Sequence, residues 1–409
     1  MHYTKRSRHE RIIRVNGKIA RNINRAVILN FVRERQPISR SEIAELTKLN
    51  KSTVSSIVAS LVEEELVVEE EAVKGQTVGR SPIHLRLRTG RNLVGAILFD
   101  SAATRIAVID LDGTIKHSSE VATEPGDPAA FVARCVDELT MLRKRHHLPH
   151  FRGIGVTVAG IVDPTESKVI FAPNLGWEHL ELGKIIHESS PDIPLVTIEN
   201  DAKASALAEL WFGSHDINLS NFVFLAVGRG IGAGIVIDKV VVSGESNAAG
   251  EFGHMTLIEG GEQCACGNQG CWEAYASDRA TVRRYRTARG LPPEPASSIM
   301  LDDIIDSVKR GNGDSAAQQE LERTGRYIGM GIANIIKAVD PDAIIIGGRV
   351  TQVWDLVYPE IMATVSKRVF FGKRPRTQIL PTSLKSRPPL LGAAALTIRE
   401  FFKDFRVTA

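Results

Sequence analysis

Residues 251–273 read EFGHMTLIEGGEQCACGNQGCWE, and they place one histidine and three cysteines within eighteen residues. Imidazole and thiolate are ligands that Zn²⁺ prefers, and four of them complete a tetrahedral structural site. The glycines at 260, 261, 267 and 270 permit tight backbone turns that direct three sulfurs toward one point. Two carboxylates, Glu251 and Glu273, end the segment beside the expected metal. The pattern predicts a structural Zn²⁺ site with His254, Cys264, Cys266 and Cys271 as its ligands.

The composition is that of a globular chain. With 409 residues, 43% of them hydrophobic, the chain has room for two or three domains. No uninterrupted apolar run reaches the roughly eighteen residues that span a membrane. The basic amino terminus, MHYTKRSRHERIIRV, lacks the apolar stretch of a secretory signal. Three of the four cysteines are clustered, which argues against a disulfide framework and favours a reducing, cytoplasmic location.

Positive charge is concentrated at the amino-terminal end. Residues 1–90 contain seventeen Lys and Arg against ten Asp and Glu, whereas the remaining residues contain 34 against 38. A basic head on a mildly acidic body indicates a polyanionic partner for the head. The alternative is a solubilising tail, which is the more common reason for a charge run on its own.

The order of predicted elements in residues 23–90 favours a polyanionic partner over a solubilising tail. Apolar spacing predicts a helix over residues 24–35, which Pro37 ends, and Ser39 to Glu42 forms a capping box that opens a second helix. Asn50 caps a third helix, whose apolar residues recur at helical spacing from Val54 to Val62. Two strands follow, at 66–68 and 83–87. This order of elements predicts a winged helix-turn-helix, preceded by a basic arm at residues 1–22.

The third helix begins with short polar side chains that suit contacts to phosphates and base edges. Arg80, beside glycine and proline in the loop between the strands, is placed to enter a minor groove. The expected DNA contacts are Arg40, Lys51, Ser52, Thr53, Ser55, Ser56 and Arg80. The acidic runs at 63–65 and 69–71 count against this interpretation and would have to face away from the duplex. The alternative is a small three-helix bundle used for protein contacts.

From residue 91 onward, strands and helices alternate. Strands are expected at 93–99, 105–110 and 153–158, with a helix at 129–145, and a second pair of strands at 222–227 and 234–237. Two β-β-α-β halves are the organisation of the two-lobed α/β actin-like and sugar-kinase folds. We expect the first lobe at 91–200, completed by a carboxy-terminal helix at about 391–409, and the second lobe, with the zinc loop, at 201–390.

Several segments of this region resemble the ROK family of repressors, uncharacterised frames and sugar kinases. The resemblance includes the Glu-x-x-His of 251–254 and the cysteine segment 264–273. It extends to ENDA at 199–202, APNLGW at 172–177, and DP at 340–341 followed by IIIGG at 344–348. It covers about residues 90–400, and the winged helix is similar to that of the family's regulators.

The resemblance also implies a sugar site. In ROK sugar kinases the Asn-Asp pair, the Glu-x-x-His and the Glu after the last cysteine bind sugar hydroxyls. Carboxylates accept hydrogen bonds from hydroxyls, and an amide both donates and accepts, so the set suits a sugar. The residues here that would bind sugar are Asn174, Asn200, Asp201, Glu251, His254 and Glu273.

Two glycine-rich turns of the family's kinases are altered in this chain. The first, usually Asp-x-Gly-x-Thr-Lys, reads DSAATR at 100–105, and the second, usually Gly-Thr-Gly, reads Gly228-Arg229-Gly230. Backbone N–H groups in such turns must approach the phosphates of ATP closely. We therefore expect no kinase activity and no catalytic residue, with Asp201, the counterpart of the kinases' general base, retained as a hydrogen-bond acceptor.

These observations predict a repressor that binds double-stranded operator DNA as a homodimer or tetramer and is controlled by a monosaccharide. The effector is a hexose, an N-acetylhexosamine or xylose, which the sequence does not distinguish. The alternative is an ATP-dependent sugar kinase with an accessory DNA-binding domain. A further alternative is an activator, or a repressor released by a protein partner.

Overall fold

The computed structural model describes residues 17–71, 83–124, 126–217, 219–292, 299–311, 313–369, 376–385 and 387–403. The described residues before Leu93 and after Thr397 form one compact unit, and Leu93–Thr397 form the other. The finer domain boundaries expected from the sequence stay a prediction. Residues 1–16 of the expected arm lie outside the described residues, and its last residues already belong to a helix, which begins at Gly17.

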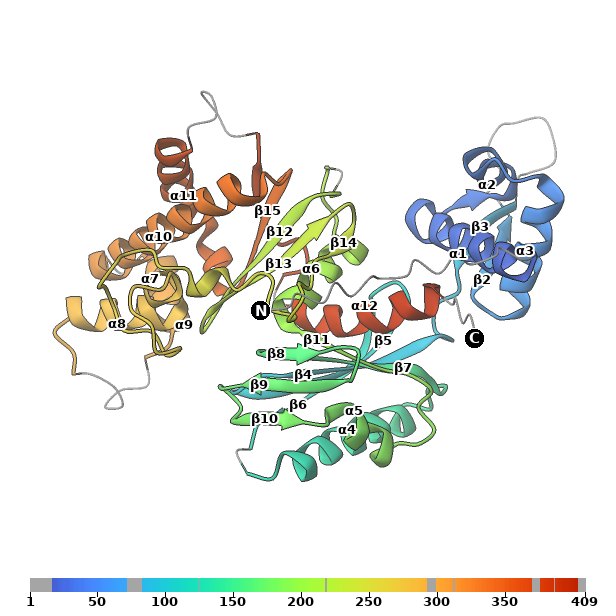
Figure 1. Ribbon diagram of the computed structural model, residues 1–409, viewed down its shortest axis with the longest axis horizontal. Helices are drawn as coiled ribbons and strands as arrows, with labels where there is room; N and C mark the ends of the chain where they lie inside the picture. Colours follow the sequence, from blue (N-terminus) through green and yellow to red (C-terminus); the bar gives the residue numbers. More distant parts are fainter. Residues whose placement is uncertain are drawn as a thin grey trace, which may run out of the picture. The chain divides into compact units, whose positions relative to one another are not determined.

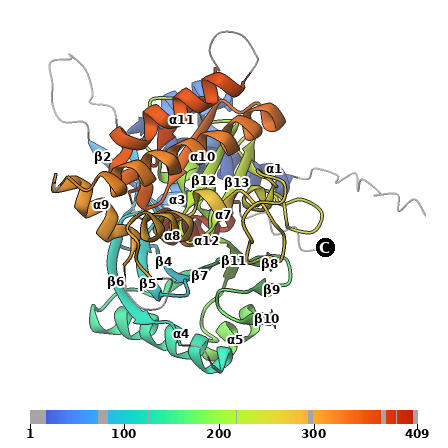
Figure 2. The ribbon, with the colours of Figure 1, turned by 90° about the vertical axis from the view of Figure 1, so that its left-hand side faces the viewer.

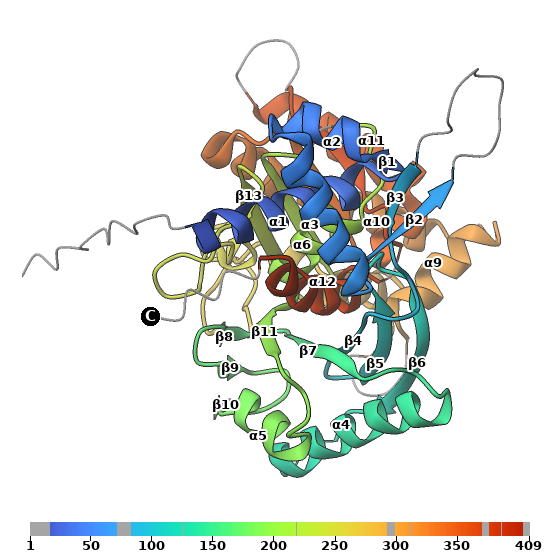
Figure 3. The same cartoon turned by 90° about the vertical axis from the view of Figure 1, so that its right-hand side faces the viewer.

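The amino-terminal unit is a winged helix-turn-helix. Its helices are α1 (Gly17–Arg35), α2 (Arg40–Thr47) and α3 (Lys51–Glu63). Its antiparallel sheet has the order β1-β3-β2, formed by β1 (Ile38–Ser39), β2 (Val67–Glu71) and β3 (Ile83–Leu87). Figure 3 shows the three helices packed together beside the hairpin of β2 and β3. Fully buried side chains from all three helices, among them Leu29, Ile43 and Leu61, form its core.

Local hydrogen bonds define where these helices begin. The Ser39 hydroxyl accepts from the Glu42 N–H, while the Glu42 carboxylate accepts from the Ser39 N–H at 2.7 Å, which confirms the capping box. The Asn50 side chain accepts from the Thr53 N–H at 3.0 Å and caps α3. α1 ends at Arg35, two residues before Pro37, as expected.

The first lobe of the larger unit is a five-stranded mixed sheet with the order β11-β7-β4-β5-β6. Its strands are β4 (Leu93–Phe99), β5 (Ala103–Asp110), β6 (Ile115–Ala122), β7 (Phe151–Val158) and β11 (Val196–Asn200). Helices α4 (Pro128–Arg145) and α5 (Leu182–Ser189) cover one face, and α12 (Pro388–Lys403) lies on the other (Figure 1). A hydrogen bond of 2.8 Å between the hydroxyls of Thr197 and Thr397 joins α12 to this sheet.

A small antiparallel sheet extends the first lobe between β7 and α5. It has the order β10-β9-β8, formed by β8 (Ile161–Asp163), β9 (Lys168–Ala172) and β10 (Trp177–Leu180).

The second lobe repeats the five-stranded pattern with the order β14-β13-β12-β15-β16. Its strands are β12 (Phe222–Val227), β13 (Ile231–Ile237), β14 (Val240–Val241), β15 (Ala343–Gly347) and β16 (Gln378–Pro381). Alternate residues of β12 face opposite ways: Phe222 and Phe224 pack with α6 (Asp201–Phe212), whereas Val223 and Leu225 pack with α10 (Ser315–Val339) and α11 (Trp354–Arg368). Figures 1 and 2 show α10 and α11 side by side.

The cysteine segment follows β14 and is held between short helical elements. These are η1 (Phe252–His254), α7 (Glu273–Ala276), α8 (Asp278–Ala288) and α9 (Leu301–Lys309), with η2 (Arg349–Val353) after β15. The two halves and their hairpins confirm the expected two-lobed α/β fold. The sequence did not indicate β1, β6, the small sheet of β8 to β10, β11, β14 or β16.

Gly331 in α10 makes room for the indole of Trp272, the residue after the last cysteine. A Cβ at position 331 would lie 2.0 Å from the Trp272 ring, which is fully buried. In an ordinary helix, replacing glycine by alanine stabilises the fold by about 1 kcal/mol. Here we expect Gly331→Ala to lower the free energy of unfolding by about 3 kcal/mol, because the packed core cannot take up the added methyl group.

Urea denaturation followed by tryptophan fluorescence measures this change. Gly17→Ala, at an α1 position with open space around it, is the matched control and should cost nothing. Equal stability of the Gly331→Ala variant and the natural protein would contradict the packing described above.

Candidate functional site

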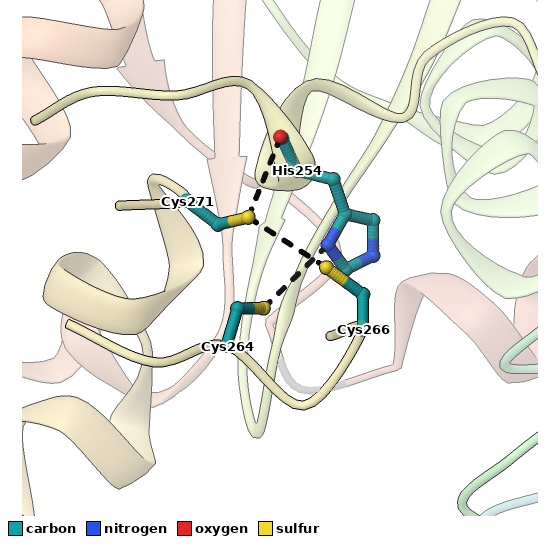
Figure 4. A group of neighbouring side chains, drawn as sticks. All are labelled: His254, Cys264, Cys266 and Cys271. Atoms are coloured by element: carbon teal, nitrogen blue, oxygen red, sulfur yellow. Dashed lines mark hydrogen bonds between the residues drawn. The ribbon is translucent and has the colours of Figure 1, made fainter. Parts of the chain in front are cut away.

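The histidine and the three cysteines predicted as metal ligands meet in one place. Their ligand atoms all lie within 4.8 Å of one another, and Figure 4 shows the four side chains converging. The Cys266 and Cys271 sulfurs are 3.7 Å apart, and the Cys264 sulfur is 3.8 Å from His254 Nδ1. In a tetrahedral zinc site, bond lengths of about 2.3 Å to sulfur and about 2.0 Å to nitrogen separate the ligand atoms by about 3.6–3.8 Å. The donor set and its spacing therefore fit a zinc ion.

The surroundings of the three thiols differ. Burial raises the pKa of Cys264 and of Cys271, whereas a hydrogen bond from the backbone N–H of Asn268 lowers the pKa of Cys266. The Cys264 thiol donates to Glu273 Oε1 at 3.2 Å. Buried thiols in such a group are inert packing residues unless a cation deprotonates them, which is what a bound metal does.

His254 connects this cluster with the two carboxylates of the segment. Its Nδ1 faces the sulfurs and lies 3.9 Å from Glu273 Oε1, while its Nε2 lies 3.9 Å from Glu251 Oε2. Glu251 is exposed and Glu273 is mostly buried. The other oxygen of Glu273 accepts from the Ile231 N–H at 3.2 Å, so this carboxylate joins the cysteine segment to the start of β13.

The amino-terminal end of α6 presents the Asn-Asp pair. The Asn200 side chain accepts from the N–H groups of Ala202 and Lys203, and its amide donates to the Gly160 carbonyl at 3.0 Å. Asn200 is therefore the N-cap of α6, and these bonds engage both ends of its amide. Asp201 follows as the first residue of the helix, where burial raises its pKa to about 6, with the nearby carboxylates of Asp100 and Glu251 adding to the rise.

The two altered turns lie at the ends of hairpins in different lobes, and they touch. Arg229, between β12 and β13, donates a hydrogen bond to the hydroxyl of Ser101, between β4 and β5. Next to it, a Cβ on Gly230 would lie 2.6 Å from Glu273 Oε2, so the carboxylate occupies the space of a side chain. The turns that in kinases would approach a phosphate are thus bonded to each other through Arg229.

The residues predicted to bind sugar do not all lie together in the fold. Glu251, His254 and Glu273 come together through the distances above, and Asp201 is close enough for Glu251 to affect its pKa. Asn174 is exposed in the turn between β9 and β10. Lys203, which the sequence did not indicate, is buried in the first turn of α6 and donates to two backbone carbonyls. The signal was the run of small apolar residues around it, AKASALA at 202–208, which is typical of a buried helix.

The predicted DNA-contact residues lie mainly at the start of α3. Lys51, Ser52 and Ser56 are exposed, and Thr53 and Ser55 are partly buried. Arg40 is engaged within the protein: its guanidinium pairs with Glu69 of β2 at 2.8 Å and donates to the Ser55 carbonyl at 3.3 Å. Arg80 lies outside the described residues.

Arginines pair with the acidic residues that had counted against DNA binding. Glu69 pairs with Arg40 and Glu70 with Arg86, while Glu64 pairs with Arg25 and Glu65 with Arg88. These pairs neutralise much of the acidic charge beside α3, so the acids do not leave a strongly negative surface there.

Within the residues that the structure describes, none of the helices has the length and apolar character that crossing a membrane requires.

Comparison with known proteins matches both parts of the chain. The model of the ROK family matches residues 96–400, and that of the MarR family matches residues 22–76. The xylose repressor of Bacillus spizizenii is 33% identical over 93% of this chain and 96% of its own length. A glucokinase of Streptomyces coelicolor is 32% identical over 73% of this chain and 95% of its own length.

Among solved structures, a ROK family transcriptional regulator described as a homologue of the Escherichia coli MLC protein superposes with a TM-score of 0.79. It is 26% identical, and the match covers 94% of this chain and 97% of that one. The family match extends over well more than half of the residues, and the two-lobed fold with its cysteine segment agrees with it. This chain belongs to the ROK family.

Proposed function

We propose that this protein is a transcriptional repressor whose affinity for operator DNA is controlled by a monosaccharide bound in its sugar-kinase fold. The observation that carries the proposal is the joining of a winged helix-turn-helix to the ROK fold in one chain. The match to the xylose repressor includes both parts, whereas the match to the glucokinase covers 73% of the chain.

The exposed start of α3 is the surface we assign to DNA. Lys51, Ser52 and Ser56 face outward, with Thr53 and Ser55 beside them, and together they offer one charge and four hydroxyl groups to phosphates and base edges. Arg40, at the start of α2, bonds to the Ser55 carbonyl of α3 and to Glu69 of β2, and it thereby stabilises this surface. A homodimer would present two such helices to an operator with two half-sites.

The sugar site we assign is formed by Asp201, Glu251, His254 and Glu273, with Asn200 holding Asp201 in place and Asn174 contributing from its turn. A zinc ion held by His254 and the three cysteines would fix the ring of His254 and the backbone on either side of it. Sugar must bind the DNA-incompetent state more tightly than the competent one, because only such a difference shifts the equilibrium.

We further propose that the protein is not a kinase. The bond from Arg229 to Ser101 places a long side chain where a glycine-rich turn would need bare backbone to bind phosphate. Phosphoryl transfer depends on positioning and electrostatic stabilisation of the phosphates, and both turns are altered: the first has lost its glycine, and the second carries an arginine between its two glycines.

The test begins with selection of an operator from random DNA, followed by fluorescence anisotropy with D-xylose, D-glucose or N-acetyl-D-glucosamine present. We expect one of these sugars to weaken operator binding by about 10- to 100-fold. A Ser56→Glu variant should lose operator affinity but keep its affinity for the sugar, and Ser56→Ala is its matched control. Lack of response to every sugar, or ATP-dependent release of ADP with any of them, would contradict the proposal.

A further inference from the structure

Lys203 is a buried cation in an unfavourable position. It lies in the first turn of α6, where residues 202–209 are all buried, and its own exposed fraction is 2%. Both burial and the positive end of the helix dipole disfavour an ammonium group there. Burial lowers the pKa of Lys203, while the carboxylates of Glu199 and Glu251 oppose that shift. An ammonium retained under these conditions must have partners that offset the cost.

Its partners are backbone carbonyls of one loop. Lys203 Nζ donates to the Asn247 carbonyl at 2.6 Å and lies 3.4 Å from the Ser243 carbonyl. The loop closes on itself, because the Ala249 N–H donates to the same Ser243 carbonyl at 3.1 Å. Asn247 has a φ of 56°, a left-handed conformation that helps to turn the carbonyls inward. The ammonium is therefore bonded to two carbonyl oxygens that both belong to this one loop.

The loop leads directly to the sugar site. Gly250 follows it with a φ of 95°, and a Cβ there would lie 2.2 Å from the Ala233 carbonyl of β13. The backbone just before Glu251 therefore packs against β13 at Gly250. The loop that precedes it is held by its hydrogen bonds to Lys203. Asp201 lies two residues before Lys203 on the same helix. One side chain consequently connects the element that carries Asp201 with the element that carries Glu251.

We propose that Lys203 is the positioning residue of the sugar site: its ammonium holds the loop at residues 243–250 and thereby fixes Glu251 relative to Asp201. The inference rests on the proposed function for the sugar itself. The contact between Lys203 and the loop does not depend on the proposed function. A binding group must be held within about 0.5 Å of its productive geometry, so release of the loop lowers affinity without removing any group that touches the sugar.

The test is Lys203→Ala in the full chain. The substitution removes three methylene groups and the ammonium, which propylammonium replaces atom for atom. Isothermal titration with D-xylose, D-glucose and N-acetyl-D-glucosamine should show affinity for the bound sugar reduced about tenfold or more. Added propylammonium should restore most of the loss. Tetramethylammonium, a cation with no N–H group, and 1-propanol, which has no charge, should not.

A second measurement does not depend on sugar. Hydrogen exchange of the sugar-free variant should be faster in residues 243–251 and unchanged in α3, and propylammonium should slow it again. Sugar affinity equal to that of the natural protein, or a loss that propylammonium leaves unchanged, would overturn the proposal. If the natural protein binds none of the three sugars, the proposed function fails, while the exchange experiment still decides whether Lys203 holds the loop.

Discussion

Replacing Cys271 by serine is expected to weaken metal binding about a thousandfold and to unfold the cysteine segment locally. Cys271 is fully buried, and its sulfur lies 3.7 Å from the Cys266 sulfur. The backbone of Cys271 forms an isolated β-bridge with Thr256. A structural zinc ion contributes roughly 10–16 kcal/mol of apparent binding free energy in zinc-finger peptides. We expect the loss of one of four ligands to cost about 4 kcal/mol or more, which is about a thousandfold in affinity.

Metal content after dialysis against a weak chelator, measured by plasma mass spectrometry, checks this result. The natural protein should keep one zinc ion per chain and the variant close to none. Cys135→Ala is the matched control, because Cys135 is a buried cysteine in the core of the first lobe. This control should lose stability but keep the metal. A Cys271→Ser protein that retains a full equivalent of zinc would show that the cluster is not the metal site.

Asp201→Asn is expected to lower sugar affinity about a hundredfold while making the free protein more stable. Burial raises the pKa of Asp201 to about 6 in the folded protein, from an ordinary value of 3.8. The folded state therefore binds the proton more tightly than the unfolded state, and stability rises as the pH falls from about 7 to about 4. At neutral pH the ionised carboxylate costs at most about 3 kcal/mol, which the asparagine variant recovers.

The loss of affinity has a separate cause. An ionised carboxylate accepts hydrogen bonds from sugar hydroxyls, and such a bond contributes about 3 kcal/mol at most. Sugar binding to the natural protein should consequently weaken below about pH 6, whereas the variant should bind weakly at every pH. Thermal unfolding and titration calorimetry between pH 5 and 8 measure both effects.

The matched control for Asp201→Asn is Asp278→Asn. Burial also raises the pKa of Asp278 to about 6, and this carboxylate pairs with Arg349. This control should change stability and leave sugar affinity unaltered. If the Asp201→Asn variant bound sugar as tightly as the natural protein, Asp201 would not be a sugar-binding residue.

The features that the sequence predicted well are local ones. The capping box at Ser39, the cap at Asn50 and the carboxy-terminal ends of α1 and α4 depend on residues three or four apart, so a linear pattern contains them; the start of α1, seven residues before the expected Asn24, was not predicted. The cysteine spacing likewise reports a group whose members are near in the chain. The edge strand β6, by contrast, is rich in polar residues and is strand because it pairs with β5, which no periodicity in its own sequence shows.

Contacts between distant residues account for what the sequence did not show. Arg40 is predicted to contact DNA from its charge and position, and the fold adds an ion pair with Glu69, 29 residues away. Asn200 is predicted to bind sugar, and the fold adds that its amide caps α6 and donates to the Gly160 carbonyl. Lys203 depends on carbonyls some forty residues away, so its role became visible only in the fold.

The orientation of His254 restricts what the proposed sugar site can recognise. Nδ1 faces the sulfurs, so a metal bound there leaves the ring hydrogen on Nε2, which faces Glu251. Toward a ligand this imidazole is then only a donor, and the Glu251 carboxylate beside it is only an acceptor. A hydroxyl group donates and accepts at once, so the two side chains match it as a pair. An ether oxygen, as in an O-methylated sugar, satisfies the imidazole and leaves the carboxylate without a partner.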